Sequence, residues 1–103
     1  MSTESLVDIA SLERKFGPMT LGFFIKAMRQ ADGISQAAYA KKLKISRANL
    51  CDIEKGRKFL SPERTVKFAK VLKMSEVLLI KLLFDDILRA AKINYSVELK
   101  KAA

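Results

Sequence analysis

Side chains that can bind a ligand through charge are concentrated in one third of this chain, between Lys41 and Lys73. The 103-residue protein carries 20 Lys and Arg against 11 Asp and Glu, which gives a formal net charge of +9. Residues 41–73 hold eleven of the basic residues and only three of the acidic ones, so this segment alone carries +8. Clustered Lys and Arg gain affinity for phosphates by displacing counterions, which favours a polyanionic partner. A well-solvated surface is the alternative, because basic composition alone specifies no partner.

Catalytic and metal-binding chemistry has few suitable residues in this sequence. The chain has no histidine and a single cysteine, Cys51. The usual zinc ligand sets therefore cannot be assembled, and we expect no metal and no cofactor. No phosphate-binding glycine loop, nucleophile elbow or paired-carboxylate pattern is present. Asp85 and Asp86 would diverge by about 100° on a helix, and we expect both to face solvent. The sequence predicts a binding protein and not an enzyme.

Length and composition fit one domain able to bury its own core. Half of the residues are apolar, which argues against wholesale disorder. Residues 1–8 carry two acids and no Lys or Arg, unlike a secretory leader, and no apolar run reaches the ~18 residues of a membrane span. We expect a soluble, cytoplasmic protein with no membrane partner.

Capping residues and apolar spacing predict five helices. They should span about 21–31, 36–43, 47–55, 62–73 and 76–91, with N-caps at Thr20, Ser35, Ser46, Ser61 and Ser75. Before them, residues 1–19 form an arm or docking helix that stops at the helix-breaking pair Gly17-Pro18. The chain thus divides into the arm, a helical domain over 20–91 and a C-terminal segment over 92–103.

The last predicted helix is apolar on more than one face, as expected for a helix that a second chain helps to bury. After it, Ile93, Tyr95, Val97 and Leu99 alternate with polar residues, the pattern of a short half-buried β-strand. We expect a homodimer, because symmetry is the simplest way to close an unpaired strand edge. The predicted dimer interface consists of Leu79, Leu83, Phe84, Ile87, Tyr95 and Val97.

Two short helices joined by Leu43-Lys44-Ile45 form a helix-turn-helix arrangement. Here the runs LGFFIKAMR (21–29), ISQAAYA (34–40) and ISRANLCDIEKGR (45–57) resemble the phage-repressor, or Xre-like, helix-turn-helix family. The matching features are the Ser-Gln opening of the second helix, the small Ala40 where two helices cross and the Ile-Glu-Lys-Gly ending of the third. This resemblance covers residues 21–84. The predicted fold is therefore all-α, a five-helix repressor-like domain with an N-terminal arm and a short C-terminal β-strand.

The resemblance implies which side chains read DNA bases. Leu50 and Ile53 should point inward, and the outward positions match the base-reading positions of the family. Arg47 can pair with a guanine edge and Asn49 with adenine, while Ala48 offers a methyl contact to thymine. Asp52 can accept from a cytosine amine or repel phosphates. The predicted base contacts are Arg47, Ala48, Asn49 and Asp52.

Phosphate contacts are expected around the same helices. Gln36 lies at an exposed helix N-terminus, where backbone amides add positive potential. Lys44 replaces the glycine usual in the family, at a left-handed position that costs a residue with a Cβ roughly 1 kcal/mol. Arg29 and Glu54 match a structural ion pair of the family, and Cys51 is interpreted as a small, half-buried side chain. The predicted phosphate contacts are Gln36, Lys44, Ser46, Lys55, Arg57 and Lys58.

The sequence thus predicts a transcriptional regulator that binds double-stranded DNA sequence-specifically, acting as a homodimeric repressor on a pseudo-palindromic operator. The alternative is an antitoxin that neutralises a co-encoded toxin protein and represses its own operon. In that case the predicted strand 93–99 would dock onto the toxin by strand addition.

Overall fold

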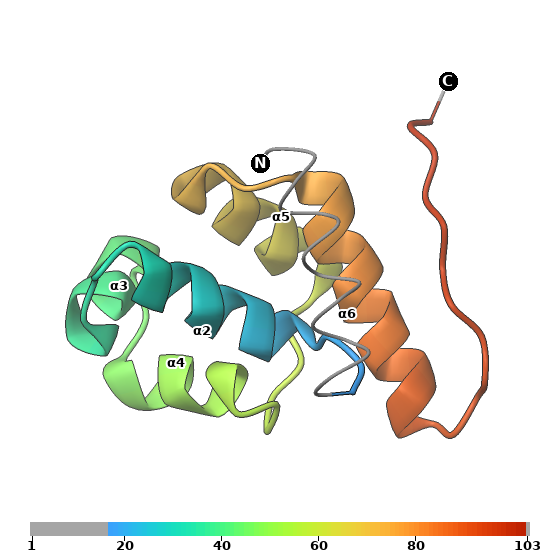
Figure 1. Cartoon of the computed structure of the whole chain (residues 1–103). Helices are drawn as coiled ribbons and strands as arrows, with labels where there is room; N and C mark the ends of the chain where they lie inside the picture. Colours follow the sequence, from blue (N-terminus) through green and yellow to red (C-terminus); the bar gives the residue numbers. More distant parts are fainter. Residues whose placement is uncertain (1–16, 103) are drawn as a thin grey trace.

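The computed structural model describes residues 17–102 and contains, over that range, five α-helices and no β-strand (Figure 1). The five predicted helices are confirmed. The first sixteen residues, which make up most of the predicted arm, lie outside the described part of the chain. The helices are α2 (Leu21–Ala31), α3 (Gln36–Leu43), α4 (Arg47–Glu54), α5 (Pro62–Leu72) and α6 (Glu76–Ala90).

A side-chain hydroxyl caps the N-terminus of every one of these helices. In each, the oxygen of the preceding Ser or Thr accepts a hydrogen bond from the backbone N–H three residues later. The first turn of a helix has no internal partners for its N–H groups, so such a cap fixes where the helix begins. The five predicted caps are confirmed: Thr20, Ser35, Ser46, Ser61 and Ser75.

The turn between α3 and α4 has the left-handed backbone expected at Lys44. Its φ and ψ are 59° and 40°. The Ile45 N–H donates to the carbonyl of Ala40 at 3.0 Å, which ties the start of the next helix to the end of α3. The left-handed conformation costs free energy at a lysine, and the hydrogen bonds of the turn, which satisfy the last carbonyls of α3, offset that cost.

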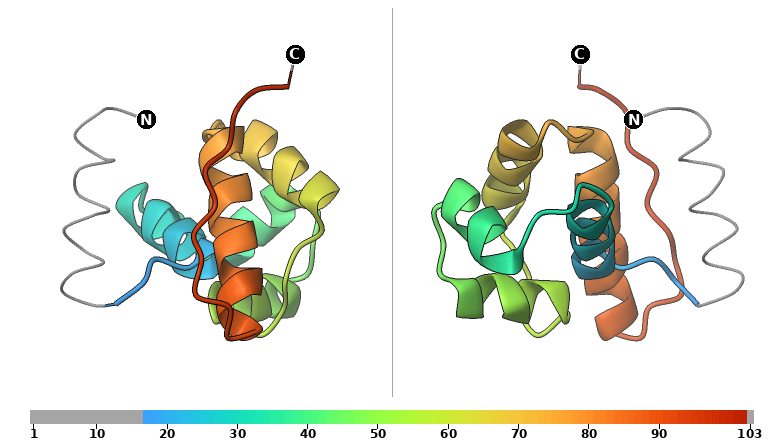
Figure 2. Two further views of the ribbon diagram at one scale, coloured as in Figure 1. Left: turned by 90° about the vertical axis from the view of Figure 1, so that its right-hand side faces the viewer. Right: turned by 60° about the vertical axis from the view of Figure 1, so that its left-hand side comes forward.

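One core joins the five helices. Helix α2 packs on α4 and α6, α5 packs on α6, and α3 packs on both α4 and α5. The α3–α4 pair and the C-terminal segment lie on opposite sides of the molecule, with α6 beside that segment (Figures 1 and 2). The largest fully buried side chains come from all five helices: Ile25, Tyr39, Leu50, Thr65, Leu79 and Leu83.

The predicted C-terminal strand is wrong. Residues 93–102 form neither strand nor helix; the chain turns back and runs along α6 (Figure 1). The described part of the chain offers no other strand with which a ladder could form, so the backbone uses a side chain instead. The Val97 N–H donates to the Asp85 carboxylate at 2.8 Å, and Ser96 Oγ lies 3.3 Å from both Asp85 oxygens. Period-2 alternation alone did not distinguish a strand from this docked segment.

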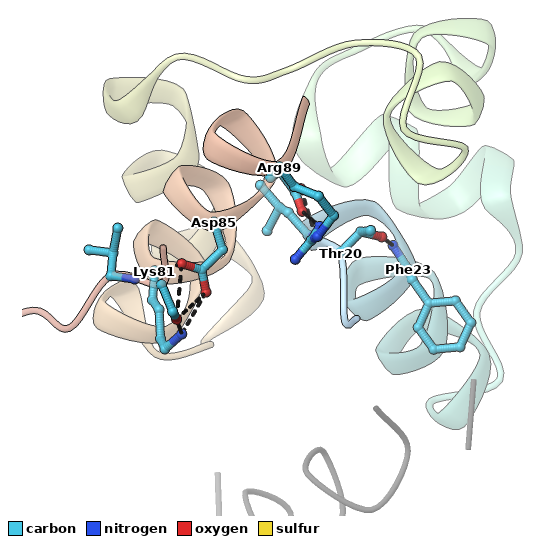
Figure 3. Close-up of polar contacts among 9 residues, drawn as sticks. Thr20, Phe23, Lys81, Asp85 and Arg89 are labelled. Atoms are coloured by element: carbon cyan, nitrogen blue, oxygen red, sulfur yellow. Dashed lines mark hydrogen bonds and ion pairs between the residues drawn. The ribbon is translucent and has the colours of Figure 1, made fainter. Parts of the chain in front are cut away.

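The prediction that Asp85 and Asp86 face solvent is wrong, because their side chains are only 12% and 11% exposed. Asp86 Oδ2 accepts the N–H of Leu21, the first residue of α2, at 3.0 Å, and its side chain is only 11% exposed. Asp85 lies beside Lys81 on the next turn of α6 (Figure 3). Burial raises the pKa of Asp86 above its usual range, despite the Leu21 N–H and Arg89 that face it. Asp86 therefore attaches the start of α2 to α6, and Asp85 attaches the C-terminal segment to it.

The described helices are too short or too polar to cross a membrane.

Candidate nucleic-acid interface

A buried ion pair supports helix α4 from behind. Arg29 of α2 reaches the carboxylate of Glu54 with Nε at 2.8 Å and Nη2 at 3.1 Å, and the two side chains are 10% and 2% exposed. Its Nη1 also donates to the carbonyl of Ile34 at 3.0 Å. The hydrogen bond to Glu54 raises the pKa of Arg29 even though burial opposes the charge. The predicted structural ion pair is confirmed, and it joins α2, α4 and the loop before α3.

Gln36 connects this pair to the surface. Its amide nitrogen donates to Glu54 Oε1 at 3.1 Å, and its amide oxygen accepts from Arg47 Nε at 3.3 Å. The first residues of the two helix-turn-helix helices are therefore held side by side. Sequence reasoning missed this chain of contacts, since 18 positions separate Gln36 from Glu54. The Ser-Gln opening and the late glutamate were its only signals.

The outer face of α4 has the predicted orientation. Leu50 and Ile53 are buried, whereas Arg47 and Ala48 are exposed and Asn49 and Asp52 are half-buried. Cys51 is half-buried as well, as expected. The outer face of α4 thus presents four different groups. They are the guanidinium of Arg47, the methyl group of Ala48, the amide of Asn49 and the carboxylate of Asp52.

Cations after α4 pack onto this face. Arg57 Nη1 lies 3.3 Å from Asp52 Oδ1, and Lys58 Nζ lies 3.8 Å from Asp52 Oδ2. Lys58 also donates to the side-chain oxygen of Asn49 at 3.4 Å. These contacts are long, and the side chains of Arg57 and Lys58 are 61% and 57% exposed. Such contacts orient the side chains but contribute little free energy, so replacing them with contacts to a ligand costs little.

The remaining predicted phosphate contacts surround the same face. Lys44 and Lys55 are exposed at the two ends of α4, one in the turn before it and one at its C-cap. Ser46 uses its hydroxyl to accept the Asn49 N–H at 3.0 Å, so its first role is that of a helix cap. The structure thus brings the predicted base and phosphate residues together on one surface, which we call the recognition surface: Gln36, Lys44, Ser46, Arg47, Ala48, Asn49, Asp52, Lys55, Arg57 and Lys58.

A glycine that sequence reasoning missed lets α4 approach α2. A Cβ added to Gly22 would lie 2.1 Å from the carbonyl oxygen of Ile53 and 2.9 Å from that of Glu54. Both neighbours are backbone atoms, so they cannot move aside as a flexible side chain would. Gly22 therefore sets the depth at which the recognition helix seats on the rest of the domain.

The residues predicted for a dimer interface are split between core and surface. Leu79 and Leu83 are fully buried within the protomer, because α2 and α5 pack on that face of α6, so they offer no surface to a second chain. Phe84 and Val97 are half-buried, Ile87 is 36% exposed and Tyr95 is 80% exposed.

Comparison with known proteins agrees with this geometry. A family model described as a helix-turn-helix domain matches residues 20–82, more than half of the chain. The match begins at the cap of α2 and ends inside α6, so it contains the recognition surface and the helices that support it. No curated protein and no solved structure matches the chain.

Proposed function

The chain belongs to the helix-turn-helix domain family, and from this premise we propose that it is a sequence-specific DNA-binding repressor that acts as a homodimer. One observation carries the proposal. The outward side chains of α4 form a single surface with the cations that follow it, and this surface lies in the segment that holds +8 of the net charge. Helix-turn-helix proteins place such a helix in the major groove of DNA.

Base reading is assigned to α4. Arg47 can donate two hydrogen bonds to the O6 and N7 of a guanine, and Asn49 can pair with the edge of an adenine. Asp52 can accept from a cytosine amine, which would cost it the contacts to Arg57 and Lys58. Those two cations then become free for phosphates. Because the contacts are long and exposed, the exchange costs little.

Backbone binding is assigned to the rim of the recognition surface. Gln36 and Ser46 lie at helix N-termini, where amide groups favour an anion. The cations Lys44, Lys55, Arg57 and Lys58 complete the set. If each of these four neutralises one phosphate, the logarithm of affinity should fall with the logarithm of salt with a slope of roughly −3.6 per protomer.

Dimerisation is assigned to α6 and the C-terminal segment. Of the predicted interface residues, Phe84, Ile87, Tyr95 and Val97 retain exposed surface. A two-fold interface there predicts a pseudo-palindromic operator with half-site centres about 34 Å apart, one turn of DNA.

The proposal is tested by selecting duplexes from a random library with the full-length protein and then titrating the selected duplex and its scrambled version across salt. We expect the selected duplex to bind at least about a thousandfold more tightly than the scrambled one at physiological salt, with a steep salt dependence for both. Equal affinity for the two duplexes, or a flat salt response, would contradict the proposal.

The antitoxin alternative has less support than the repressor proposal. Residues 93–99, which would pair as a strand with a toxin, form no strand in the described part of the chain.

A further inference from the structure

The recognition surface holds fewer than half of the cations that give residues 41–73 their charge. Five of the eleven Lys and Arg of that segment belong to it, and six do not. The six are Lys41, Lys42, Arg64, Lys67, Lys70 and Lys73. Two of the three acids of the segment, Glu54 and Glu63, also lie outside the recognition surface. Half of the charge of +8 therefore has no partner assigned to it by the contacts of the recognition surface with DNA.

Three of these six cations line a groove that adjoins the recognition surface. The groove lies between the α3–α4 turn and α5 and has a volume of about 440 Å³. Lys42 lines it from α3, and Arg64 and Lys67 line it from α5. Lys44, which belongs to the recognition surface, lines it from the turn. No carboxylate lies among the described residues that line the groove. We call this feature the α5 groove, and Lys44 makes it continuous with the recognition surface.

Arg64 and Lys67 present two neighbouring positive charges on one side of α5. They stand three residues apart, about 4.5 Å along the helix axis. Both are exposed, and within residues 17–102 neither forms an ion pair, as is also true of Arg47 and Lys55 on the recognition surface. A DNA strand carries one phosphate for about every 3.4 Å of helix axis. Two adjacent cations without a carboxylate between them are complementary to such a strand.

An aromatic ring orients Arg64 without neutralising its charge. The guanidinium lies over the ring of Phe68, 5.6 Å from its centroid. A guanidinium stacked in this way keeps the N–H groups at its edge for an acceptor such as a phosphate. By contrast, Arg57 must exchange its contact with Asp52 before it binds a phosphate. Val71, which is 41% exposed and also lines the groove, offers apolar contact to the deoxyribose between phosphates.

We propose that the α5 groove binds the phosphate backbone of the same duplex that α4 reads, with Arg64 and Lys67 each contacting one phosphate. This inference rests on the proposed function, because α4 must lie in the major groove. A strand that passes Lys44 at the start of α4 then continues into the α5 groove. Phosphate contacts position a protein and carry no base information, so the groove strengthens binding to every duplex. Two further phosphates should steepen the salt slope from roughly −3.6 to roughly −5.4 per protomer.

Replacement of single phosphates by uncharged methylphosphonate tests the proposal with the full-length protein. Each phosphate position of the selected duplex is replaced in turn, in both half-sites, and affinity is measured by fluorescence anisotropy. Replacing a contacted phosphate should weaken binding of the unmodified protein roughly fivefold. Lys67→Ala should become insensitive at one of these positions and reduce the salt slope by about 0.9. Lys58→Ala should become insensitive at a different position, because Lys58 lies outside the α5 groove.

Lys70→Ala is the matched control. Lys70 is exposed on the same helix, three residues after Lys67, but does not line the groove. Its variant should keep the salt slope and the phosphate sensitivity of the unmodified protein, and far-ultraviolet circular dichroism checks that all variants remain folded. The proposal is overturned if Lys67→Ala behaves as Lys70→Ala does, or if Lys67→Ala and Lys58→Ala become insensitive at the same phosphate. Preference of the unmodified protein for the selected over the scrambled duplex tests the repressor proposal separately, so the two failures are distinguishable.

Discussion

Two aspartates, Asp52 and Asp85, each contact more than one polar or charged group, but Asp52 is more exposed to solvent than Asp85. The contacts of Asp52 are 3.3 and 3.8 Å long, and its partners Arg57 and Lys58 are mostly exposed. Asp85 has a side chain only 12% exposed and receives Lys81, the hydroxyl of Ser96 and the Val97 N–H (Figure 3). One cluster lies on the recognition surface and the other attaches the C-terminal segment to α6.

The polar contacts of Asp52 orient exposed side chains, whereas those of Asp85 hold a chain segment in place. Exposed, long ion pairs contribute about 0–1 kcal/mol and can be exchanged for phosphates or bases. Shielded contacts to a charged acceptor contribute more, and breaking them leaves donors without partners. A surface that binds DNA needs contacts that can be exchanged for contacts to DNA. A segment without a strand partner needs shielded contacts that hold it in place. The ion pair of Arg29 and Glu54 is the most buried of these contacts, with side chains 10% and 2% exposed.

The largest effect is expected where burial is greatest. Glu54→Gln keeps the shape of the side chain but leaves the Arg29 guanidinium buried and uncompensated, so the free energy of unfolding should fall by about 3–5 kcal/mol. Urea denaturation measures the change, with Glu98→Gln on the exposed C-terminal segment as control. A loss below about 1 kcal/mol would show that the Arg29–Glu54 ion pair contributes no more to stability than an exposed one.

Arg47→Ala should lower discrimination between the selected duplex and one changed at the contacted guanine by about 1–3 kcal/mol. Affinity for a random duplex should change much less, because the lost hydrogen bonds go to a base edge. Competition fluorescence anisotropy measures both affinities, and Lys100→Ala in the C-terminal segment serves as control. Unchanged discrimination would remove Arg47 from base reading.

Asp85→Asn should release the C-terminal segment from α6. Hydrogen exchange at the Val97 amide should accelerate about tenfold, the equivalent of 1.4 kcal/mol. The matched variant Asp86→Asn should instead accelerate exchange at Leu21, whose N–H it accepts. If Val97 exchanges at the same rate in both variants, Asp85 does not hold the segment.

The same contact should depend on pH. Burial raises the pKa of Asp85, but the bonds from Lys81, Val97 and Ser96 together outweigh it and leave the pKa below the ordinary value of 3.8. The carboxylate therefore stabilises docking fully above that value, and the contribution is lost as pH falls from 3.8 through the lowered folded-state pKa. Val97 exchange followed in the acid range, corrected for intrinsic rates, measures this; docking that strengthens with acid would contradict it.

Lys58→Ala should weaken selected and random duplexes alike, by less than about 1 kcal/mol, and reduce the salt slope by about 0.9. The side chain carries no base information if it meets only phosphate. Anisotropy titrations at several salt concentrations measure the slope. A loss confined to the selected duplex would instead make Lys58 a base-reading residue.

Asp52→Asn is expected to have the smallest effect on folding. Both of its ion pairs are long and exposed, so the free energy of unfolding should change by no more than about 0.5 kcal/mol. Urea denaturation beside Asp85→Asn makes the comparison direct. A loss above about 1 kcal/mol at Asp52 would place its cluster among the contacts that hold the fold.

Local chemistry made much of this fold predictable. A Ser or Thr before an apolar repeat satisfies free N–H groups within three residues, so the helix starts could be read directly. The left-handed turn at Lys44 was expected from the resemblance to a family that usually has glycine there. The orientation of α4 followed from Leu50 and Ile53, which lie three positions apart and face the core.

Contacts between distant residues were not predictable in this way. The alternation at 93–99 indicated a strand, but no strand partner exists over residues 17–102, and Asp85 satisfies the Val97 N–H instead. Leu79 and Leu83 have the same apolar character as Ile87, and only the packing of α2 and α5 decides which of them are buried. Gly22 gives no sign in the sequence that the carbonyl of Ile53 lies against it.

Amide chemical-shift mapping of the full-length protein with the selected duplex tests most directly that the recognition surface, and not the C-terminal side, meets DNA. We predict the largest shifts at Gln36 and along residues 46–52, and unchanged shifts at Val97, on the other side of the molecule. Shifts that are largest along α6 and the C-terminal segment, with α4 unaffected, would contradict the account.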